Sequence, residues 1–544
     1  MRLSLLAAGV RGTAVESGAE YEVRRIVQDS RQAGPGDLFV AIRGRRVDGH
    51  LFAPIAADRG AALALEHAVP HSSSAACLHL RDSRAALGEL AAVLHGRPAR
   101  HLKVVGVTGT AGKSTTTHMA AHVLASARVP AGCLSTISLC AGAAAVENRS
   151  GQSTMEATAV QAWLARMRSD GDRAAVLEVT SHALVQDRVG ACDFDVAAVT
   201  NVGRDHLDYH GTPEAYLQAK ARLIRLCAEA PGKGTPKTAV LNRDDPSFAA
   251  LAAVPIERRI TYGIDHPADV RAVDIGRCSF LLTTTEGSAP VQLTPPGRFN
   301  AANALCAAAT CLALGVPLDV VAAGLSSFPG LCGRLEAVHL GQPFEVYVDF
   351  AHTALGLESV LRELRRITGR LLLAVFGTTA RADHDRPGMG RAAARYADHF
   401  VITTDDPMSQ PPIDLARQIE AGAAGGHCEI VLDRGAAIRR ALGLARPGDT
   451  VPLAGKGHER TMLLANGPEP WDEQAEAVAA LAELGYRASG PASGSSGRGS
   501  TRSPTASIRR PVAHRIADRP IRSLAASPPL PRARVNPGYV EAFV

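Results

Sequence analysis

A glycine-rich segment that carries a lysine and two hydroxyl side chains is the part of the sequence best suited to chemistry. It runs from Lys103 to Thr115 and reads Lys-Val-Val-Gly-Val-Thr-Gly-Thr-Ala-Gly-Lys-Ser-Thr. An apolar run followed by small residues, a cation and hydroxyls is the order of a strand, a phosphate-binding turn and a helix N-terminus. We therefore predict a nucleoside triphosphate site here, followed by a helix that reaches about Ala127.

Each residue of the predicted turn has a separate role. Gly109 and Gly112 allow backbone N–H groups to approach phosphate oxygens, Lys113 adds a charge, and Ser114 offers a hydroxyl to Mg²⁺. The general P-loop pattern has a glycine where Val107 stands, so only the shorter Gly-Thr-Ala-Gly-Lys-Ser form is present. A plain strand-to-helix turn with one exposed lysine also explains this segment. Residues further along the chain must distinguish this turn from a phosphate-binding loop.

Two later apolar runs end in groups that bind metals. Glu178 ends the run 174–179 and is followed by Val-Thr-Ser-His, while His206 lies in Asn-Val-Gly-Arg-Asp-His-Leu-Asp after the run 196–200. In a parallel sheet the carboxyl ends of strands meet at one edge, where ligands bind. We expect Glu178 and His206 to hold a metal near the phosphates. Taken singly, each residue is more often a capping or hydrogen-bonded group.

The alternation of apolar runs and helical patterns predicts an α/β fold with doubly wound parallel sheets. We expect a small N-terminal domain over 1–100, a central domain over 101–336 and a C-terminal domain over 337–487. Further strands are expected at 38–42, 238–241, 344–348, 371–376, 400–403, 429–432 and 450–453, and a small hairpin at 279–284 and 291–294. Residues 488–544 are rich in Ser, Pro, Gly and Arg without periodicity, which predicts a disordered tail.

Composition is that of an ordinary soluble protein of several domains. The chain has 544 residues, of which 46% are hydrophobic and 21% charged, and its ten cysteines form no C-x-x-C pair, which fits a reducing cytoplasm. Residues 488–544 carry a formal charge of +7, whereas the whole chain carries +6. Residues 1–487 are therefore nearly neutral, and we expect no nucleic acid partner. No apolar run approaches the ~20 residues of a membrane span. The opening apolar run ends at Arg11, and we expect no signal peptide.

Four segments together resemble one enzyme family, the Mur ligases, and within it the MurE type. They are Gly-Thr-Ala-Gly-Lys-Ser, Glu-Val-Thr-Ser-His-Ala-Leu, Thr-Asn-Val-Gly-Arg-Asp-His-Leu-Asp-Tyr-His-Gly and Glu-Ala-Tyr-Leu-Gln-Ala-Lys-Ala-Arg-Leu. The resemblance runs from Asp29 to about Glu473. It implies an N-terminal UDP-binding domain, a central ATPase and a C-terminal Rossmann-like domain, in a cytoplasmic enzyme of peptidoglycan precursor synthesis that we expect to be a monomer.

The resemblance also implies a reaction and its residues. ATP phosphorylates the terminal carboxylate of a UDP-muramoyl dipeptide, and the amine of an amino acid attacks the acyl phosphate. The implied ATP-binding residues are Gly109, Thr110, Ala111, Gly112, Lys113, Ser114, Thr115, Asn303, Arg334 and Asp349. The implied Mg²⁺ ligands are Ser114, Glu178, His206 and Lys220, the last standing where the family carries a lysine carbamoylated by CO₂. Lys113, Glu178, His206 and Lys220 are the implied catalytic group.

The other two substrates are assigned in the same way. The residues implied for the UDP-muramoyl substrate are Asp29, Ser30, Arg31, Ser153, Thr154, Thr180, Gln186 and Arg188. Those implied for the amino acid are Arg386, Asp406, Met408, Gly455 and Glu459.

Departures from the family cluster near the substrates. Ser153-Thr154-Met155 replaces Thr-Thr-Pro, and Asp385 replaces a lysine in the 379–387 loop. Diaminopimelate-adding members carry Asp-Asn-Pro-Arg where this chain has Asp-Asp-Pro-Met, ending at Met408. Methionine cannot donate to the distal carboxylate of diaminopimelate, and Asp406 repels it. We infer an amino acid that lacks this carboxylate, either lysine-like with its amine near Asp406 or another nonstandard amine.

Two alternatives stay open at this stage. One is a diverged Mur-type ligase that joins an amino acid to a different carboxylate in specialised metabolism, which the altered substrate segments favour. The other is a catalytically weak nucleotide-binding scaffold, against which the reactive residue types at positions 113, 114, 178, 206 and 220 all speak.

Overall fold

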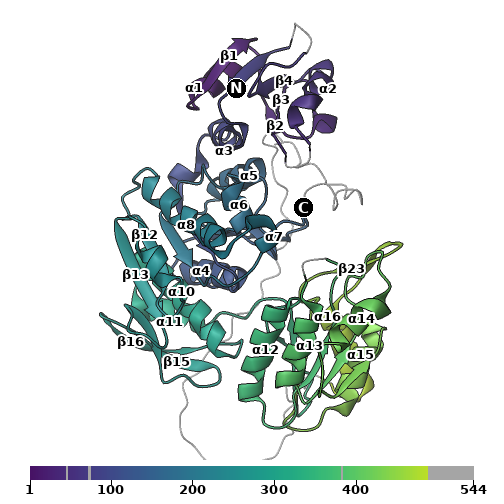
Figure 1. The fold of residues 1–544 in the computed structure, drawn as a ribbon. Helices are drawn as coiled ribbons and strands as arrows, with labels where there is room; N and C mark the ends of the chain where they lie inside the picture. The colour runs from purple at the N-terminus through teal and green to yellow at the C-terminus, as the bar shows by residue number, and fades with distance from the viewer. Residues whose placement is uncertain (45–46, 71–74, 382–383, 488–544) are drawn as a thin grey trace, which may run out of the picture.

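The computed structural model describes residues 1–44, 47–70, 75–381 and 384–487. These residues form three sheets flanked by helices and one separate hairpin. Figure 1 shows three bodies, with the N-terminal one at the top, the central one on the left and the C-terminal one at the lower right. This arrangement confirms the predicted α/β class with three domains. The exact boundaries at 100, 336 and 487 stay predictions, and the tail predicted at 488–544 lies outside the described residues.

The N-terminal domain has a five-stranded sheet in the order β1-β5-β4-β3-β2, in which only β1 runs antiparallel to its neighbour. The strands are β1 Thr13–Ser17, β2 Arg25–Val27, β3 Asp37–Val40, β4 Ala62–Leu65 and β5 Cys77–Leu80. The helices are α1 Leu3–Ala8, α2 Ala53–Asp58 and α3 Ser83–Leu94, with short 3₁₀ helices η1 Ser30–Gln32, η2 Gly49–Phe52 and η3 Pro98–His101. Strands β3 and β4 are buried throughout, because α2 and α3 contribute to hydrophobic clusters on the two faces of the sheet.

The central domain is built on an eleven-stranded sheet in the order β16-β15-β14-β13-β12-β11-β6-β10-β7-β8-β9. Pairing is parallel from β14 to β7 and antiparallel at both edges. The strands are β6 Lys103–Thr108, β7 Ala131–Leu134, β8 Ser138–Ala141, β9 Ala144–Glu147, β10 Ala174–Glu178, β11 Val196–Val199, β12 Thr238–Asn242, β13 Arg258–Gly263, β14 Val270–Val273, β15 Ser279–Thr284 and β16 Gly287–Gln292. The parallel centre matches the sequence prediction, and the antiparallel pair β15 and β16 corresponds to the predicted hairpin. The antiparallel edge made by β8 and β9 was not predicted.

Helices cover both faces of this sheet. They are α4 Lys113–Ser126, α5 Ala157–Ser169, α6 Ser181–Val185, α7 Leu207–His210, α8 Pro213–Glu229, α9 Phe248–Ala252, α10 Arg298–Ala313 and α11 Leu318–Ser326. Helices α4, α10 and α11 pack in one apolar cluster, and α5 and α8 pack in the cluster on the other face. The predicted strand 291–294 was placed too late, because the hairpin pairs Gly287 with Thr284 and ends at Gln292.

The C-terminal domain has a six-stranded sheet in the order β17-β18-β22-β19-β20-β21, parallel except for β17. Its strands are β17 Glu336–Ala337, β18 Glu345–Asp349, β19 Leu373–Phe376, β20 His399–Ile402, β21 Cys428–Ile430 and β22 Thr450–Ala454, and a hairpin joins β23 Thr461–Leu464 to β24 Gly467–Pro470. The helices are α12 Ala354–Ile367, α13 Arg386–Tyr396, α14 Pro412–Glu420, α15 Arg434–Leu444 and α16 Glu473–Glu483.

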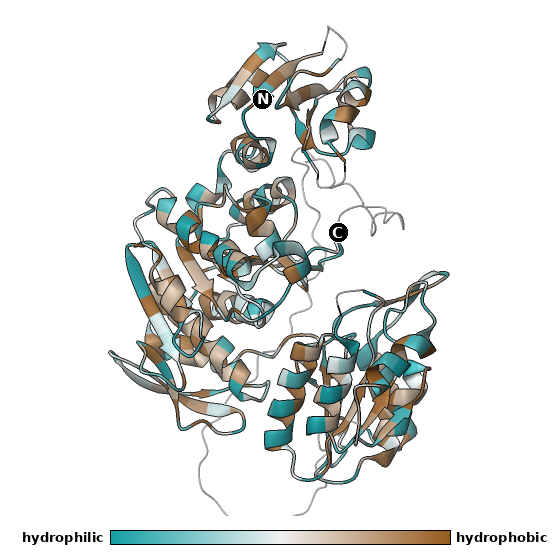
Figure 2. Ribbon diagram, in the orientation of Figure 1, coloured by the Kyte–Doolittle hydropathy of each residue, from teal (hydrophilic) through white to brown (hydrophobic). Residues whose placement is uncertain are grey.

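Helix α12 shows why the helices adopt these positions. It buries Leu357, Val360, Leu361 and Leu364, which recur at the spacing of one helix face. In Figure 2 its turns carry hydrophilic residues in teal beside hydrophobic residues in brown, and the strands behind it contain many brown residues. Within the described ranges, no helix combines the length and the apolar character needed to cross a bilayer.

Candidate active site

The glycine-rich loop lies at the carboxyl ends of three neighbouring strands. Strand β6 leads into it, and β10 and β11 pair with β6 on either side. Glu178 is the last residue of β10, and Asn201 follows β11 by two positions. Asn201 Oδ1 accepts from the Ala111 N–H at 3.0 Å and its Nδ2 donates to Ala111 O, also at 3.0 Å. The predicted gathering of polar groups at this sheet edge is present.

Two glycines are required by close approach and by backbone conformation. Gly112 has φ +81°, and a Cβ on it would lie 2.1 Å from Asn303 Oδ1. Gly109 has φ +155°, and a Cβ there would lie 1.8 Å from Thr200 Oγ1. Both distances are far below van der Waals contact, so a side chain at either position would push the loop away from its supports.

Two lysines meet beneath the loop. Lys220 Nζ, on α8, donates to Gly109 O at 2.7 Å, and Lys113 Nζ donates to the same oxygen at 3.1 Å and to Thr110 O at 3.0 Å. Lys220 is 1% exposed and its Nζ lies 4.3 Å from the centre of the Tyr216 ring. Burial, followed by the like charge of Lys113, lowers the pKa of Lys220 well below its ordinary value. Burial also lowers the pKa of Lys113, against the attraction of Glu178 and Asp205.

An oxygen-lined corner beside the loop fits a magnesium ion. Ser114 Oγ donates to Glu178 Oε2 at 2.8 Å, and Thr136 donates to the same carboxylate through its N–H at 2.9 Å and its hydroxyl at 3.0 Å. Glu178 and Ser114 are buried. A hydroxyl and a carboxylate are the hard oxygen ligands that Mg²⁺ prefers together with phosphate and water. The donors of Ser114 and Glu178 therefore fit Mg²⁺, and we call these two residues the metal corner.

His206 lies in the same cavity but within a cluster of rings. It is the residue immediately before α7 and has φ +52°, and its ring centre is 4.7 Å from that of His182 and 6.4 Å from that of Tyr216. Tyr216 in turn contacts Lys220, so His206 and Lys220 both lie near one tyrosine ring. Among the described residues, Glu178 and His206 do not belong to a group of three ligand side chains within 4.8 Å of one another.

One cavity of about 3870 Å³ connects most of the predicted site. The predicted residues that line it are Asp29, Ser30, Arg31, Thr110, Ala111, Gly112, Lys113, Ser114, Thr115, Ser153, Glu178, Thr180, His206, Asn303, Arg334, Asp349, Asp406, Met408, Gly455 and Glu459. Six others lie behind its wall, namely Gly109, Thr154, Gln186, Arg188, Lys220 and Arg386. All three domains thus contribute to one space.

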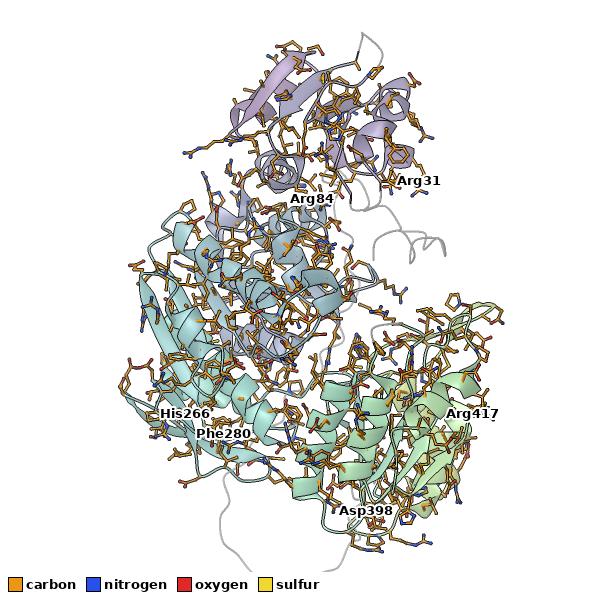
Figure 3. All side chains as sticks on the ribbon, viewed as in Figure 1. Arg31, Arg84, His266, Phe280, Asp398 and Arg417 are labelled. Carbon is orange, nitrogen blue, oxygen red and sulfur yellow. The ribbon has the colours of Figure 1, made fainter. Side chains whose placement is uncertain are left out.

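The residues expected at the UDP-muramoyl substrate divide into lining and supporting groups. Asp29 accepts from the Arg31 N–H at 3.0 Å and pairs with its guanidinium at 2.9 Å, so it also has the turn-forming role that its residue type suggests. Arg31 is labelled at the lower right of the N-terminal domain in Figure 3. Thr154 Oγ1 donates to Glu178 O at 2.9 Å, and Arg188 Nη1 donates to Thr154 O at 2.8 Å. Thr154 and Arg188 therefore support the wall.

Gln186 has the same supporting role. Its Oε1 accepts from Arg188 Nη2 at 2.7 Å and from Nε at 3.0 Å, and Arg188 also pairs with Glu156 at 2.9 Å. Thr180 lines the cavity while its hydroxyl caps α6 by accepting from the Ala183 N–H at 3.2 Å.

The C-terminal part of the cavity is acidic around one buried lysine. Lys456 Nζ contacts Glu459 Oε2 at 2.6 Å, Asp406 Oδ1 at 2.8 Å and Asp405 Oδ1 at 3.6 Å. Burial alone would lower the pKa of Lys456, but these carboxylates raise it above its ordinary value. Burial raises the pKa of Glu459. Three carboxylates surround one ammonium, so the group retains an excess of acidic side chains.

Arg386, expected to contact the amino acid, begins α13 and is 8% exposed. Its Nη2 donates to Thr379 O at 3.0 Å and to Arg381 O at 2.6 Å, and its Nη1 donates to Gln418 at 3.2 Å. In this structure it joins the main chain at Thr379 and Arg381 to Gln418 on α14.

Arg334 and Asp349 lie where the central and C-terminal domains join. Asp349 accepts from the Leu335 and Ala351 N–H groups, each at 2.8 Å, and burial raises its pKa against the opposing charge of Arg334. Arg334 lies with its guanidinium carbon 4.9 Å from the centre of the Phe350 ring. Both residues line the same cavity as the loop.

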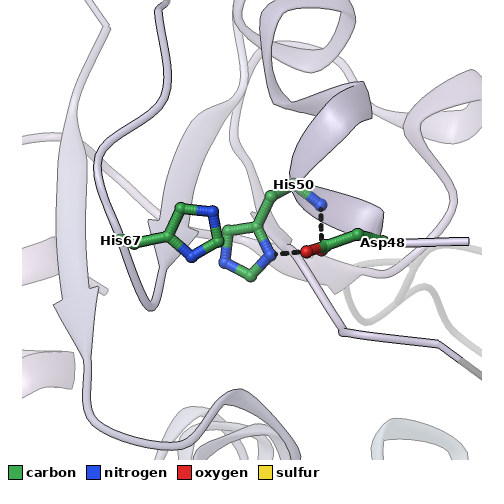
Figure 4. Close-up of side chains that lie close together, drawn as sticks. All are labelled: Asp48, His50 and His67. Carbon is green, nitrogen blue, oxygen red and sulfur yellow. Dashed lines mark hydrogen bonds and ion pairs between the residues drawn. The ribbon is translucent and has the colours of Figure 1, made fainter.

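A second group with metal-binding side chains, Asp48, His50 and His67, lies in the N-terminal domain (Figure 4). His50 Nδ1 is 2.7 Å from Asp48 Oδ1, and its Nε2 accepts from the Glu66 N–H at 3.0 Å. The His67 ring stacks on His50 with 4.1 Å between ring centres. Both nitrogens of the buried His50 ring are therefore used within the domain, and the arrangement is that of a structural histidine.

Sequence reasoning missed three residues of the site. Thr136 binds the Glu178 carboxylate but belongs to none of the quoted motifs. Asn201 lies within the quoted segment that begins Thr-Asn-Val-Gly, and Lys456 follows Gly455, yet neither received a role. Asn201 lies two positions after β11 and Lys456 two positions after β22, each at the carboxyl end of a parallel strand, and this placement was the available signal.

Comparisons with known proteins agree with this geometry. Three family models match the chain, described as "Mur ligase family, catalytic domain" over 22–95, "Mur ligase middle domain" over 107–311 and "Mur ligase, glutamate ligase domain" over 333–457. The UDP-N-acetylmuramyl-tripeptide synthetase of Roseiflexus sp. is 42% identical over 486 residues, which cover 86% of this chain and 96% of the relative.

A second relative and a solved structure extend the likeness. The UDP-N-acetylmuramoyl-L-alanyl-D-glutamate--2,6-diaminopimelate ligase of Geobacillus kaustophilus is 39% identical over 496 residues, which cover 89% of this chain and 100% of the relative. A solved structure of a ligase with the same name has a TM-score of 0.64 and 27% identity, and the match covers 89% of this chain and 100% of that one. The chain therefore belongs to the Mur ligase family.

Proposed function

We propose that this protein is an ATP-dependent ligase that adds an amino acid to UDP-N-acetylmuramoyl-L-alanyl-D-glutamate in peptidoglycan precursor synthesis, in the cytoplasm. The observation that carries the proposal is the single cavity lined by the phosphate loop, by the Asp29 turn and by the Asp406 group. Such a space is what a reaction of three substrates needs, with one substrate held by each domain. The two relatives named above carry names of wall-precursor ligases.

The reaction follows from what the loop can do. The carboxylate of the acceptor attacks the γ-phosphorus of ATP, the bond to the β-phosphate oxygen breaks, and ADP leaves. The amine then attacks the acyl phosphate, a C–N bond forms, phosphate leaves and the amine loses its proton. Backbone N–H groups of the loop hold the phosphates, and Lys113 balances the charge that develops on the transferred group.

Ser114 and Glu178 are the residues that would bind Mg²⁺ in this reaction. Mg²⁺ bound there supplies charge neutralisation for the phosphates. Thr136 fixes the Glu178 carboxylate by two hydrogen bonds, so one carboxylate oxygen is directed toward Ser114 before any substrate binds. His206 lines the cavity nearby, and we assign it to the second metal position.

We also propose that Lys220 carries a carbamate formed with CO₂. A side chain that is 1% exposed, faces a tyrosine ring and has only a shared carbonyl oxygen as a hydrogen-bond acceptor is poorly placed to remain an ammonium. Carbamoylation replaces the positive charge by a carboxylate beside Tyr216, the ring that His206 also lies near.

The charged residues of the cavity indicate which amino acid the enzyme accepts. Met408 lines the cavity and offers no donor to a distal carboxylate, and the Asp405, Asp406 and Glu459 carboxylates outnumber Lys456. An acidic pocket favours a substrate whose side chain ends in an amine. We therefore propose a lysine-like or neutral amino acid in preference to meso-diaminopimelate.

Phosphate release from ATP in the presence of the acceptor and single amino acids tests this function, with the product identified by mass. Turnover that requires both acceptor and amine is the expected result, and UDP-N-acetylmuramoyl-L-alanine, which lacks the glutamate, serves as the matched control acceptor. If every amino acid fails although ATP binds, the wall-precursor function is wrong and a diverged ligase with another carboxylate acceptor takes its place.

A further inference from the structure

Two cysteines face each other in the central domain beside the metal corner. Cys133 on β7 and Cys140 on β8 are register partners in the antiparallel hairpin, and their sulfurs are 3.2 Å apart. Across the described residues, no other two cysteine sulfurs are in contact. The proposed ligase reaction uses neither thiol.

The geometry of the pair is close to that of a disulfide. Cα atoms of directly opposite residues on antiparallel strands are about 4.5 to 5.5 Å apart, within the range of about 4.4 to 6.8 Å that disulfides span. The sulfurs must approach by about 1 Å to reach bonding distance, a movement that side-chain rotation and a small shift of the hairpin can supply. We propose that Cys133 and Cys140 form a redox-active dithiol that a peroxide oxidises to a disulfide.

The two thiols are unequal, and this assigns their roles. Cys140 is half-buried, and the hydrogen bond from Cys133 lowers its pKa to about 7 in spite of desolvation. Cys133 is 2% exposed, and that hydrogen bond together with burial raises its pKa. Because the thiolate is the nucleophile, Cys140 attacks first.

The steps balance with hydrogen peroxide as the oxidant. The Cys140 thiolate attacks one peroxide oxygen, the O–O bond breaks, and the leaving hydroxide takes a proton to become water, which leaves Cys140 as a sulfenic acid. The Cys133 sulfur then attacks the Cys140 sulfur, the S–O bond breaks, and the Cys133 proton leaves with the hydroxyl as a second water. Two thiols lose two electrons, and one peroxide gains them.

The hairpin transmits this change to the metal corner. Residues 135–137 connect the two strands, and Thr136 within this turn donates twice to the Glu178 carboxylate. Ser135 lies 2.9 Å from His118 Nε2 on α4, the helix that begins at the phosphate loop. A shift of the hairpin therefore moves the partners of Glu178, and displacements of about 1 Å in a site can cost orders of magnitude in rate.

A mass measurement tests the dithiol directly. Trypsin releases both cysteines in one peptide, 129–149, which contains no internal lysine or arginine. The full-length protein is treated with hydrogen peroxide, unfolded in the presence of a thiol alkylating reagent and digested. We expect this peptide to lose two hydrogen masses and to escape alkylation, and to regain both thiols after dithiothreitol. Cys306 and Cys311, five positions apart on α10, stay alkylated as the internal control.

Variants separate the roles of the two sulfurs. In Cys133→Ser, dimedone traps a sulfenic acid on Cys140, whereas in Cys140→Ser the peptide remains a free thiol. If both cysteines of the wild-type protein stay fully alkylatable after peroxide, or if Cys140→Ser is trapped by dimedone as readily as Cys133→Ser, the proposal is wrong.

The consequence for activity rests on the proposed ligase function. We expect oxidised protein to release phosphate about tenfold more slowly or worse, with recovery on reduction, and Cys140→Ser to be insensitive to peroxide. Equal rates for oxidised and reduced protein would overturn the coupling to the metal corner. A protein that forms the disulfide but shows no ligase turnover at all would contradict the ligase function and leave the dithiol standing.

Discussion

Lys220 Nζ and Lys113 Nζ donate to the same main-chain oxygen, that of Gly109, at 2.7 and 3.1 Å. Two ammonium groups that converge on one carbonyl repel each other, and Lys113 accordingly depresses the pKa of Lys220. Conversion of Lys220 to a carbamate removes the repulsion and leaves Lys113 to the phosphates. The relationship connects the nucleotide loop to helix α8 and gives the first prediction.

Lys220→Ala should lose about a thousandfold in turnover while it retains ATP binding, because the phosphate loop does not depend on α8 for its N–H groups. Phosphate release and calorimetric titration with ATP measure the two properties. Arg225→Ala, on the exposed side of α8, is the matched control and should be fully active. Wild-type turnover in Lys220→Ala, or no incorporation of isotopically labelled bicarbonate into the native protein, would remove the carbamate from the account.

Gly112→Ala should weaken ATP binding by about a hundredfold or more, because its Cβ would meet Asn303 Oδ1 at 2.1 Å. Gly171→Ala separates the steric clash from backbone strain. Gly171 has a similar φ of +90° but open space around it, so this variant should lose only about 1 to 2 kcal/mol of stability and bind ATP normally. Equal ATP affinities in the two variants would show that the contact with Asn303 is unimportant.

The sequence could predict the phosphate loop but only part of the site around it. The spacing of Gly109, Gly112, Lys113 and Ser114 was sufficient for the loop, because its chemistry resides in consecutive residues. For the strands that bring Glu178 beside the loop, the sequence predicted a parallel sheet but not the order of the strands within it. Thr136 could not be found, because its contact with Glu178 joins residues 42 positions apart and depends on a hairpin at an antiparallel sheet edge.

Asp406→Asn combined with Met408→Arg should raise kcat/KM for meso-diaminopimelate relative to lysine by about tenfold or more. The arginine supplies a bidentate donor for the distal carboxylate, and the first substitution removes one acidic charge beside Lys456. Each single variant should give a smaller change. Unchanged preference in the double variant would show that other side chains select the amino acid.

Asp406 also shows a limit of the sequence prediction. The aspartate was expected to be available to a substrate amine, but Lys456 already contacts it at 2.8 Å. Lys456 lies 50 positions further along the chain, so only the folded sheet, in which β20 and β22 flank β19, reveals the pairing.

Glu473→Ala should destabilise the C-terminal domain by about 3 to 5 kcal/mol, because it leaves the Arg434 guanidinium buried without its partner. The two side chains are 1% and 0% exposed and share two hydrogen bonds of 2.7 and 2.8 Å. Urea unfolding followed by Trp471 fluorescence in a Trp163→Phe background reports this domain. Glu483→Ala, which removes an exposed partner of Arg439, should change the midpoint very little. Equal midpoints for the two variants would contradict the importance of the buried pair.

The most direct measurement for the central claim is the fate of the acceptor's carboxylate oxygen. UDP-N-acetylmuramoyl-L-alanyl-D-glutamate labelled with heavy oxygen in its free carboxylates is turned over with ATP, Mg²⁺ and the accepted amino acid, and the released phosphate is weighed by mass spectrometry. Transfer of one labelled oxygen to each phosphate is predicted, because the carboxylate oxygen becomes the bridge of the acyl phosphate and leaves with phosphorus. Unlabelled phosphate released in proportion to the amide product would contradict activation of the carboxylate by ATP in this cavity.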